Sequence, residues 1–265
     1  MKFDAALALH SLPAMLHGLV VTIGLAVLVI ALGLIVSIPL AVARTSRRPV
    51  IAWPAAAYVI FFRGTPAMIL LFFVYYGFGQ LYGARDGLLG AVFSNGFLCA
   101  VIGFTLNHSA YVAEIFRGGL QSVPRGLVEA AAALGIEPRD VFLRIRLPLA
   151  IRYGLKAYQN EVILFTKATA VVSVITVVDL TAVANNIFYD TYDPFTPLLT
   201  AAAFYWVLVN LIRIGLARLD TWLNVHLRVD ERRDGAVAIH AATGRTEGLA
   251  PRPVPAAGRV SEAAE

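Results

Sequence analysis

Charge is scarce in this sequence. Only 15% of its 265 residues are Asp, Glu, Lys or Arg and 58% are hydrophobic, whereas a soluble domain usually carries about a quarter of its residues as charges. This balance excludes an ordinary soluble domain and predicts an integral membrane protein. The formal net charge of +5 comes from basic residues at the ends of apolar runs and in one connecting segment. That pattern sets membrane topology and excludes a nucleic-acid surface.

Residues that build reactive sites are also scarce. The single cysteine, Cys99, lies in an apolar run, which excludes a disulfide framework and a thiolate metal cluster. The sequence has no Gly-rich phosphate loop ending in Gly-Lys-Ser/Thr and no nucleophile elbow, and its five histidines are scattered. We therefore predict that the chain has no catalytic site, metal or cofactor of its own. A partner or an ion gradient would then supply the energy for its work.

The apolar runs predict the transmembrane helices. Residues 16–42 carry no formal charge and exceed the roughly 20 residues that cross a bilayer, so this run is a retained first span and not a signal peptide. Arg44, Arg47 and Arg48 follow it, which predicts a cytoplasmic end there and residues 1–15 outside. Further spans are predicted over residues 66–82, 88–113, 158–178 and 195–212.

The connections complete the predicted topology. Residues 51–62 are apolar but too short to span, so they are expected in the membrane interface, with a helix restart at Gly64-Thr65-Pro66. Residues 179–195 contain no Lys or Arg, which is typical of an outside loop. The prediction is an all-α membrane protein with about five transmembrane helices, an outside N-terminus and an inside C-terminus. Its transmembrane domain covers residues 16–228, and residues 229–265 lack apolar periodicity, which predicts a disordered cytoplasmic tail.

Polar side chains inside the spans are the candidates for a substrate path, because ionisable groups at membrane depth are costly and usually functional. They are Asn107, His108, Asn160, Glu161, Lys167 and Thr169. The alternative for Asn107 and His108 is that they only hydrogen-bond neighbouring helices. Glu161 and Lys167 are six residues apart, about 9 Å along a helix, which is too far for a direct pair.

Glu161 carries the most specific prediction. We expect its carboxylate to receive the cationic group of a substrate, with Asn107 and Asn160 as hydrogen-bond partners. The alternative is a permanent structural pair with Lys167 of a neighbouring subunit or with Arg63.

Residues 122–148 are polar and basic between apolar segments, and they predict a cytoplasmic helical hairpin. Residues 126–134 are good helix formers, Gly135 suits the left-handed position that ends a helix, and Pro138 suits the first turn of the next. Pro148 then ends or kinks the second helix. Such a hairpin either docks a soluble partner or lies as an amphipathic unit on the membrane surface.

Three groups of residues carry a resemblance to a known family. The hairpin resembles the cytoplasmic loop signature of ABC importer permease subunits, through Glu129, Ala130, Ala131, Gly135, Ile145, Leu147 and Pro148. Residues 62–66 and 111–119 resemble the polar amino acid branch. Residues 157–164 and 191–195 resemble permeases for histidine, lysine, arginine and ornithine, or for the opines octopine and nopaline. Many polar amino acid permeases have Lys-Asp-Ser/Thr where this chain has Lys167-Ala168-Thr169, a departure shared with the basic and opine subgroup.

The resemblance implies function and partners. The chain would be the permease subunit of a binding-protein-dependent importer in the inner membrane of a bacterium, surrounded by lipid. Its hairpin residues would form coupling helices against an ATPase that binds ATP and Mg²⁺. The implied assembly contains a second permease subunit, which is a second copy or a related chain, two ATPase subunits and an extracytoplasmic substrate-binding protein.

Two other functions fit the residues without the resemblance. One is a gradient-driven transporter or channel that uses Glu161 and Lys167 as an ion relay. The other is a membrane scaffold whose basic hairpin recruits a soluble protein. Five spans enclose a path poorly on their own, which favours the permease that pairs with a second subunit.

Overall fold

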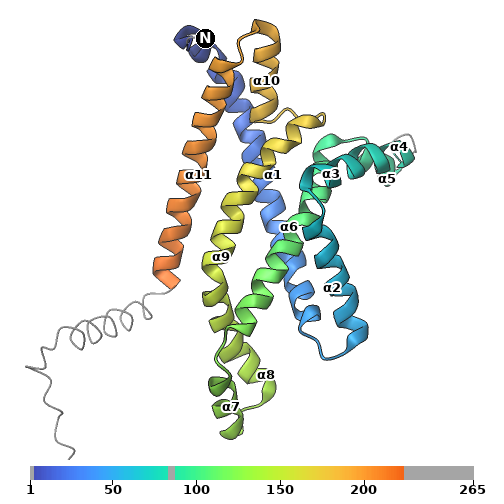
Figure 1. The fold of residues 1–265 in the computed structure, drawn as a ribbon, viewed down its shortest axis with the longest axis vertical. Coiled ribbons are helices and arrows are strands. Elements are labelled where there is room, and N and C mark those ends of the chain that lie inside the picture. The colour runs from blue at the N-terminus through green and yellow to red at the C-terminus, as the bar shows by residue number, and fades with distance from the viewer. Residues whose placement is uncertain (1–2, 83–86, 224–265) are drawn as a thin grey trace, which may run out of the picture. The chain divides into compact units, whose positions relative to one another are not determined.

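The computed structural model describes residues 3–82 and 87–223, and every regular element in these ranges is helical (Figure 1). The predicted tail, residues 229–265, lies outside them. The α-helices are α1 (Ala5–Arg44), α2 (Pro49–Gly64), α3 (Ala67–Phe72), α4 (Gly79–Tyr82), α5 (Leu88–Phe93), α6 (Gly96–Gln121), α7 (Arg125–Ala133), α8 (Pro138–Asp140), α9 (Leu147–Ala168), α10 (Leu180–Thr191) and α11 (Phe195–Leu223). Two π-helical segments, η1 (Phe73–Phe78) and η2 (Val141–Arg146), and the 3-10 segment η3 (Thr169–Val174) join them.

Helix α1 is longer than the predicted first span. The Asp4 side chain accepts hydrogen bonds from the N–H groups of Ala6 and Leu7, which caps the helix at its start. From there 40 residues run to Arg44, about 60 Å at 1.5 Å per residue. Most of residues 1–15, predicted as a segment that precedes the span, therefore belongs to the same helix.

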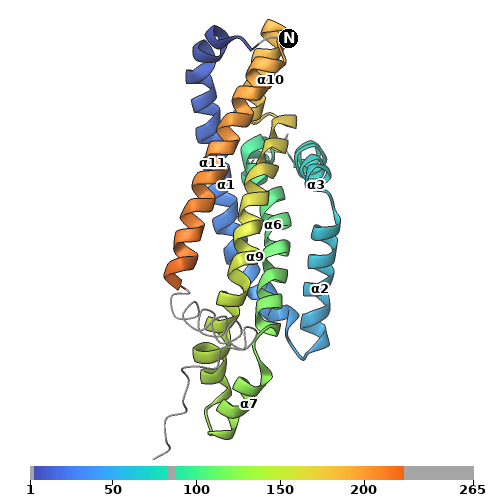
Figure 2. The same ribbon diagram turned by 60° about the vertical axis from the view of Figure 1, so that its left-hand side comes forward.

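Helices α2 and α3 meet at a bend of 103°. Thr65 ends α2, and its hydroxyl donates back to the Phe61 carbonyl, while α3 starts after Pro66. We predicted that the second piece crosses the membrane and that the first lies in the interface. In the structure α2 runs alongside α1 and α6, and α3 turns away from the direction of α2 while still packing against α6 (Figures 1 and 2). The bend places a backbone corner against the middle of α6.

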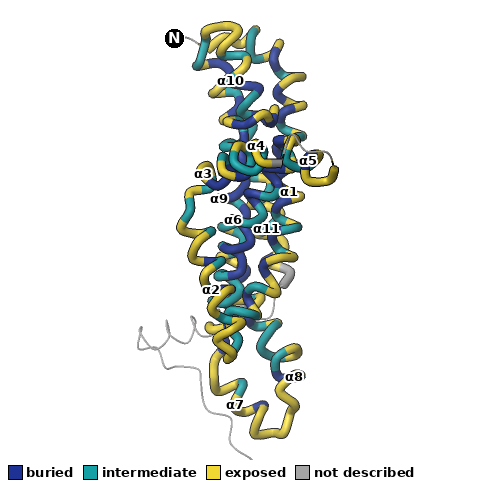
Figure 3. The backbone as a smooth tube through the Cα atoms, turned by 90° about the vertical axis from the view of Figure 1, so that its right-hand side faces the viewer, coloured by how far each residue is buried: buried dark blue, intermediate teal, exposed yellow. Residues whose placement is uncertain are grey.

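Helices α6 and α9 form the centre of the fold. Asn95 caps α6 by accepting from the N–H groups of Phe97 and Leu98. The span predicted over residues 88–113 is therefore broken at this cap, and the long helix starts at Gly96 rather than at Leu88. Helix α6 packs against α1, α2, α3 and α9, and Figure 3 shows buried residues concentrated along it. A polar side chain on the buried part of α6 is therefore costly unless it finds a hydrogen-bond partner.

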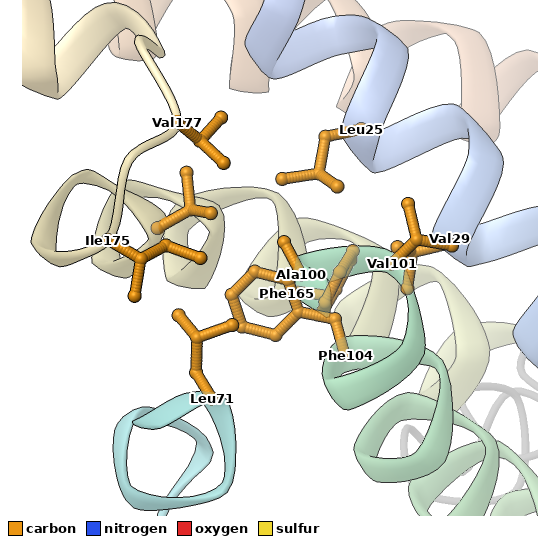
Figure 4. Close-up of a cluster of buried hydrophobic side chains, with 10 residues drawn as sticks. Leu25, Val29, Leu71, Ala100, Val101, Phe104, Phe165, Ile175 and Val177 are labelled. Carbon is orange, nitrogen blue, oxygen red and sulfur yellow. The ribbon is translucent and has the colours of Figure 1, made fainter. Parts of the chain in front are cut away.

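The hydrophobic core lies where α1, α3, α6, α9 and η3 converge (Figure 4). The rings of Phe104 and Phe165 meet edge to face with their centroids 5.5 Å apart, an arrangement that adds about 0.5–1.5 kcal/mol to the burial of their area. The cluster comprises Leu25, Val29, Leu71, Ala100, Val101, Phe104, Phe165, Val172, Ile175 and Val177. It fixes the spacing of α6 and α9 one turn away from His108.

The described residues contain three helices long and apolar enough to cross a membrane, α1, α6 and α11, or four if the bent pair α2–α4 counts as one span. Helix α9 is not among them, although it is 22 residues long. It carries Arg152, Lys156, Glu161 and Lys167, which lower its hydropathy. The prediction of five spans therefore depends on α9.

The hairpin has the predicted turn. Gly135 adopts a φ of +73° after α7, and the N–H groups of Gly135 and Ile136 bond to the carbonyls of Ala132 and Ala131. Pro138 starts α8 as predicted. Pro148 does not end the second helix, because α8, η2 and α9 follow one another without a break. Pro148 lies in the first turn of α9, directly after the π-helical residues of η2, whose wider hydrogen-bond register accommodates a residue without an N–H.

Candidate functional site

A cavity of about 400 Å³ lies between the α2–α3 corner, α6 and α9. Positions 107 and 111 on α6 are one turn apart, and positions 161, 164, 165 and 168 on α9 share one face of that helix. The lining residues are Arg63, Gly64, Thr65, Pro66, Ala67, Asn107, Tyr111, Glu161, Leu164, Phe165 and Ala168. Three elements far apart in sequence thus close around one space.

Two opposite charges line the cavity. Glu161 and Arg63 are the charged residues in this lining, from α9 and from the α2–α3 corner. The Glu161 side chain is only 14% exposed, so water screens its charge poorly. The site therefore offers one negative and one positive group to a ligand in a space that is otherwise apolar or neutral.

Glu161 has a partner that the sequence did not identify. Its Oε1 lies 3.3 Å from Nδ1 of His108, and the His108 side chain is fully buried. Arg63 forms no ion pair with Glu161 among the described residues. The other structural alternative, a pair with Lys167 of a neighbouring subunit, stays a prediction. The pair His108–Glu161 links α6 to α9.

Asn107 and Tyr111 hold the corner against α6. The Asn107 amide donates to the carbonyl of Phe62 at 2.7 Å, and the Tyr111 hydroxyl donates to the carbonyl of Arg63 at 3.2 Å. The Arg63 guanidinium lies over the Tyr111 ring, 5.3 Å from its centroid, where the ring face attracts a cation. These contacts satisfy carbonyls that the end of α2 leaves without helical partners.

The predicted path residues divide into three groups. Asn107 and Glu161 line the cavity, and His108 lies behind Glu161. Asn160 and Lys167 are exposed and do not line it, and Thr169 is buried with its hydroxyl donating to the Thr166 carbonyl. Asn107 bonds to Phe62 and Asn160 lies on another face of α9, so the structure shows neither of them as the hydrogen-bond partner predicted for Glu161.

A second cavity is poorly suited to bind a polar ligand. It measures about 510 Å³ and lies between the start of α1 and α11, where Thr200 is its one polar lining residue. No group of three or more His, Cys, Asp or Glu residues that could hold a metal occurs in the part of the chain that the structure describes. The cavity beside Glu161 is therefore the candidate functional site.

Beyond the cavity, an ion-pair cluster joins α6 to α1. The Glu114 carboxylate contacts Arg44 of α1 at 2.7 Å and also pairs with Arg117 on its own helix. The spacing of Glu114 and Arg117, three residues apart on a helix, predicts their local pair, and the structure confirms it. The contact with Arg44 does not follow from spacing. The cluster ties the ends of the two helices together near the hairpin.

The hairpin residues that carry the family resemblance differ in how exposed they are. Glu129, Ala130, Gly135 and Pro148 are exposed, Ala131 is buried, and Ile145 and Leu147 are half-buried. Glu129 also lines a cleft of about 460 Å³ between α7, the end of α6 and Arg146. The exposed surface consists of α7 and the turn after it (Figure 3).

Comparisons with known proteins agree with this arrangement. The chain is 37% identical to the nopaline transport system permease protein NocM of Agrobacterium fabrum, over 90% of this chain and 98% of that protein. It is 39% identical to the octopine permease OccM of Rhizobium meliloti (84% and 90% of the two chains) and 39% identical to the histidine/lysine/arginine/ornithine permease HisM of Salmonella typhimurium (76% and 86%).

Among solved structures, the crystal structure of an amino acid ABC transporter with histidines matches with a TM-score of 0.75 and 32% identity, over 83% of this chain and 99% of that one. The MetNI methionine ABC transporter shares the fold, with a TM-score of 0.61 at 21% identity. The family model described as binding-protein-dependent transport system inner membrane component matches residues 30–225. The chain therefore belongs to this family, the multi-pass inner-membrane permease subunits of ABC importers.

Proposed function

We propose that this chain imports cationic amino acids or opines and that the cavity beside Glu161 receives the substrate. The observation that carries the proposal is that Glu161 and Arg63, which carry opposite charges, both line one cavity. An amino acid carries a carboxylate as well as an ammonium or guanidinium group, so the two charges match the two ends of such a molecule. The volume of about 400 Å³ falls within the usual range of ligand pockets.

Burial makes the Glu161 carboxylate selective for cations. An ionised group at membrane depth is costly unless it is paired, and a substrate cation supplies that pair. The transport systems of the relatives are named for the compounds nopaline, octopine, histidine, lysine, arginine and ornithine. Arginine, lysine, ornithine and the two arginine-derived opines share a cationic side chain, which is the group that we assign to Glu161.

For topology we propose five spans, with the N-terminus outside and the C-terminus inside. Helix α9 is the fifth, because the cavity it lines would otherwise lack one wall. Residues 179–195 have no Lys or Arg, whereas the hairpin region is rich in arginine, which supports placing α10 outside and α7–α8 in the cytoplasm. Residues 16–228 would then form the transmembrane domain.

The hairpin is proposed as the site that couples ATP hydrolysis to transport. Leu134 is 80% exposed beside Gly135, and Leu127 on α7 is 47% exposed. An ATPase subunit that covers these side chains would remove them from water. Glu129, Ala130, Ala131 and Gly135 form the contacting surface in this proposal, with Ile145, Leu147 and Pro148 supporting it, and ATP and Mg²⁺ bind the separate ATPase. The chain itself has no catalytic role.

A second permease subunit is proposed against the exposed face of α9. Lys156, Asn160 and Lys167 are exposed along one side of this helix, and lipid would leave them without partners. A neighbouring permease, identical or related, offers polar partners and closes the path. Two ATPase subunits and an extracytoplasmic binding protein complete the proposed importer.

The test reconstitutes the whole importer in liposomes and compares wild type with Glu161→Gln, which keeps the size and removes the charge. Uptake of arginine, octopine and nopaline is measured with saturating binding protein. We expect uptake to fall about tenfold or more while assembly and basal ATP hydrolysis remain normal. Asp190→Asn, which removes an exposed carboxylate on α10, is the control. Wild-type uptake by the Glu161 variant, or no uptake of any of these compounds by the wild type, would contradict the proposal.

A further inference from the structure

The His108 side chain occupies a space that only glycine on the facing helix allows. A Cβ at Gly33 of α1 would lie 2.7 Å from Cδ2 of the imidazole, closer than real side chains approach. On its other side the ring lies 4.7 Å from the Phe165 ring, centroid to centroid. The imidazole is therefore held between α1 and α9 with little freedom to turn.

The two ring nitrogens have different surroundings. Nδ1 faces Glu161 at 3.3 Å, whereas Nε2 is buried and has no hydrogen-bond partner among the described residues. Leaving a buried polar atom unsatisfied costs about 1–3 kcal/mol. With a proton on Nδ1, the imidazole donates a hydrogen bond to the Glu161 carboxylate.

His108 does not line the cavity, but Glu161 does. A side chain as flexible as glutamate can adopt several rotamers, and a cation gains most from a carboxylate that is already ordered. One carboxylate oxygen bound to Nδ1 still leaves the other oxygen free for a ligand.

We propose that His108 is a positioning residue, whose Nδ1–H holds the Glu161 carboxylate at the cavity wall for the substrate cation, and that Gly33 provides the space this requires. The proposal rests on the function proposed for Glu161 and adds two residues that never contact the substrate. It assigns to α1 a part in substrate affinity although α1 contributes no residue to the cavity lining.

The test uses the assembled importer in detergent without binding protein, so that the equilibrium dissociation constant of radiolabelled arginine reports on the permease cavity. His108→Leu removes the donor and should raise this constant about tenfold. His108→Asn retains an amide N–H near the position of Nδ1 and should restore most of the affinity. Gly33→Ala displaces the ring and should behave like His108→Leu. Thr105→Val is the control. It removes a buried hydroxyl of α6 that, like Nε2 of His108, has no hydrogen-bond partner among the described residues, and it should leave arginine affinity unchanged.

A double-mutant cycle separates positioning from a structural role. In the Glu161→Gln background, His108→Leu should cause no further loss, because its effect acts through the carboxylate. Binding of neutral glutamine should change little in any variant, whereas a misfolded complex would lose both ligands. Losses that add in the double mutant, or equal losses for both amino acids, would overturn the positioning role.

The outcome for Glu161→Gln alone distinguishes the two proposals. If it weakens arginine binding while His108→Leu binds like wild type, the cavity function stands and the role of His108 is wrong. If Glu161→Gln itself binds arginine normally, the cavity function fails first. Should Gly33→Ala not assemble, the two His108 variants and the cycle still decide the matter.

Discussion

The polar cluster of His108 and Glu161 beside the cavity and the cytoplasmic hairpin obtain their structure in opposite ways, the first from helix packing and the second from neighbouring residues. Glu161 is 14% exposed, and its partner is 53 positions away in the chain, whereas Gly135 and Leu134 lie in the open with neighbours only a few residues away. The cluster depends on how α1, α6 and α9 pack, and the hairpin depends on local backbone chemistry. We therefore expect substitutions in the first region to affect substrate binding, and those in the second to affect the response to ATP.

The contact between α6 and α9 is the strongest test of the packed region. A Cβ at Gly119 would clash with the Ala150 carbonyl oxygen, whereas the space around Gly118 is open. Gly119→Ala should separate the helices and cost about 2 kcal/mol or more, seen as a lower temperature of complex dissociation. Gly118→Ala should be neutral or slightly stabilising, by up to about 1 kcal/mol. Equal effects of both changes would mean that the helices do not approach so closely.

The turn of the hairpin gives the corresponding test of the exposed region. Gly135→Val forces a β-branched residue to a φ of +73°, at a cost on the order of 1–3 kcal/mol that falls on the turn alone. ATP hydrolysis stimulated by binding protein should drop severalfold, while arginine binding to the cavity persists. Gly126→Ala, in α7 with open space around it, is the control. Unchanged stimulation would exclude the hairpin as the coupling element.

Substitution of Asn107 tests whether the α2–α3 corner contributes to substrate binding in the cavity. Asn107→Ala removes the donor to the Phe62 carbonyl, and the unsatisfied group should cost about 1–2 kcal/mol. The loosened corner carries Arg63, so arginine affinity should fall modestly with basal ATP hydrolysis intact. Measurement of both quantities on one preparation decides this. A change in hydrolysis without one in affinity would assign the corner to coupling instead.

The ion-pair cluster lies between the two regions and should contribute least. Arg44→Gln removes one of two partners of Glu114, and Arg117 remains. Partly exposed pairs contribute about 1 kcal/mol or less. The dissociation temperature should fall by a few degrees at most, and more at low salt than at high salt. Arg47→Gln, an exposed arginine after α1, should show no such change.

Local signals in the sequence predicted the hairpin better than the cavity. Gly135 and Pro138 fix backbone geometry by themselves, so the turn and the start of α8 were predictable. The spacing of Glu114 and Arg117 predicted their pair in the same way. His108 and Glu161 were both singled out as polar residues at depth, but their pairing depends on the relative rotation of two helices, which no local pattern encodes. Pro148 does not end the helix because the π-helical segment before it accommodates a residue without an N–H.

The part of the cavity wall that the α2–α3 corner forms could not be predicted from the sequence either. The turn at residues 64–66 indicated a restart, but the 103° bend and the position of Arg63 over Tyr111 arise from packing against α6. Tyr111 gave one signal that could have been used, since it lies one helical turn from Asn107 on the same face.

The position of a bound substrate tests the central claim most directly. The measurement is a structure of the assembled importer in lipid with arginine bound. The account predicts density in the cavity between α3, α6 and α9, with the guanidinium within about 3 Å of the Glu161 carboxylate and the substrate carboxylate toward Arg63. Arginine bound elsewhere, or bound there with its guanidinium directed away from Glu161, would contradict it.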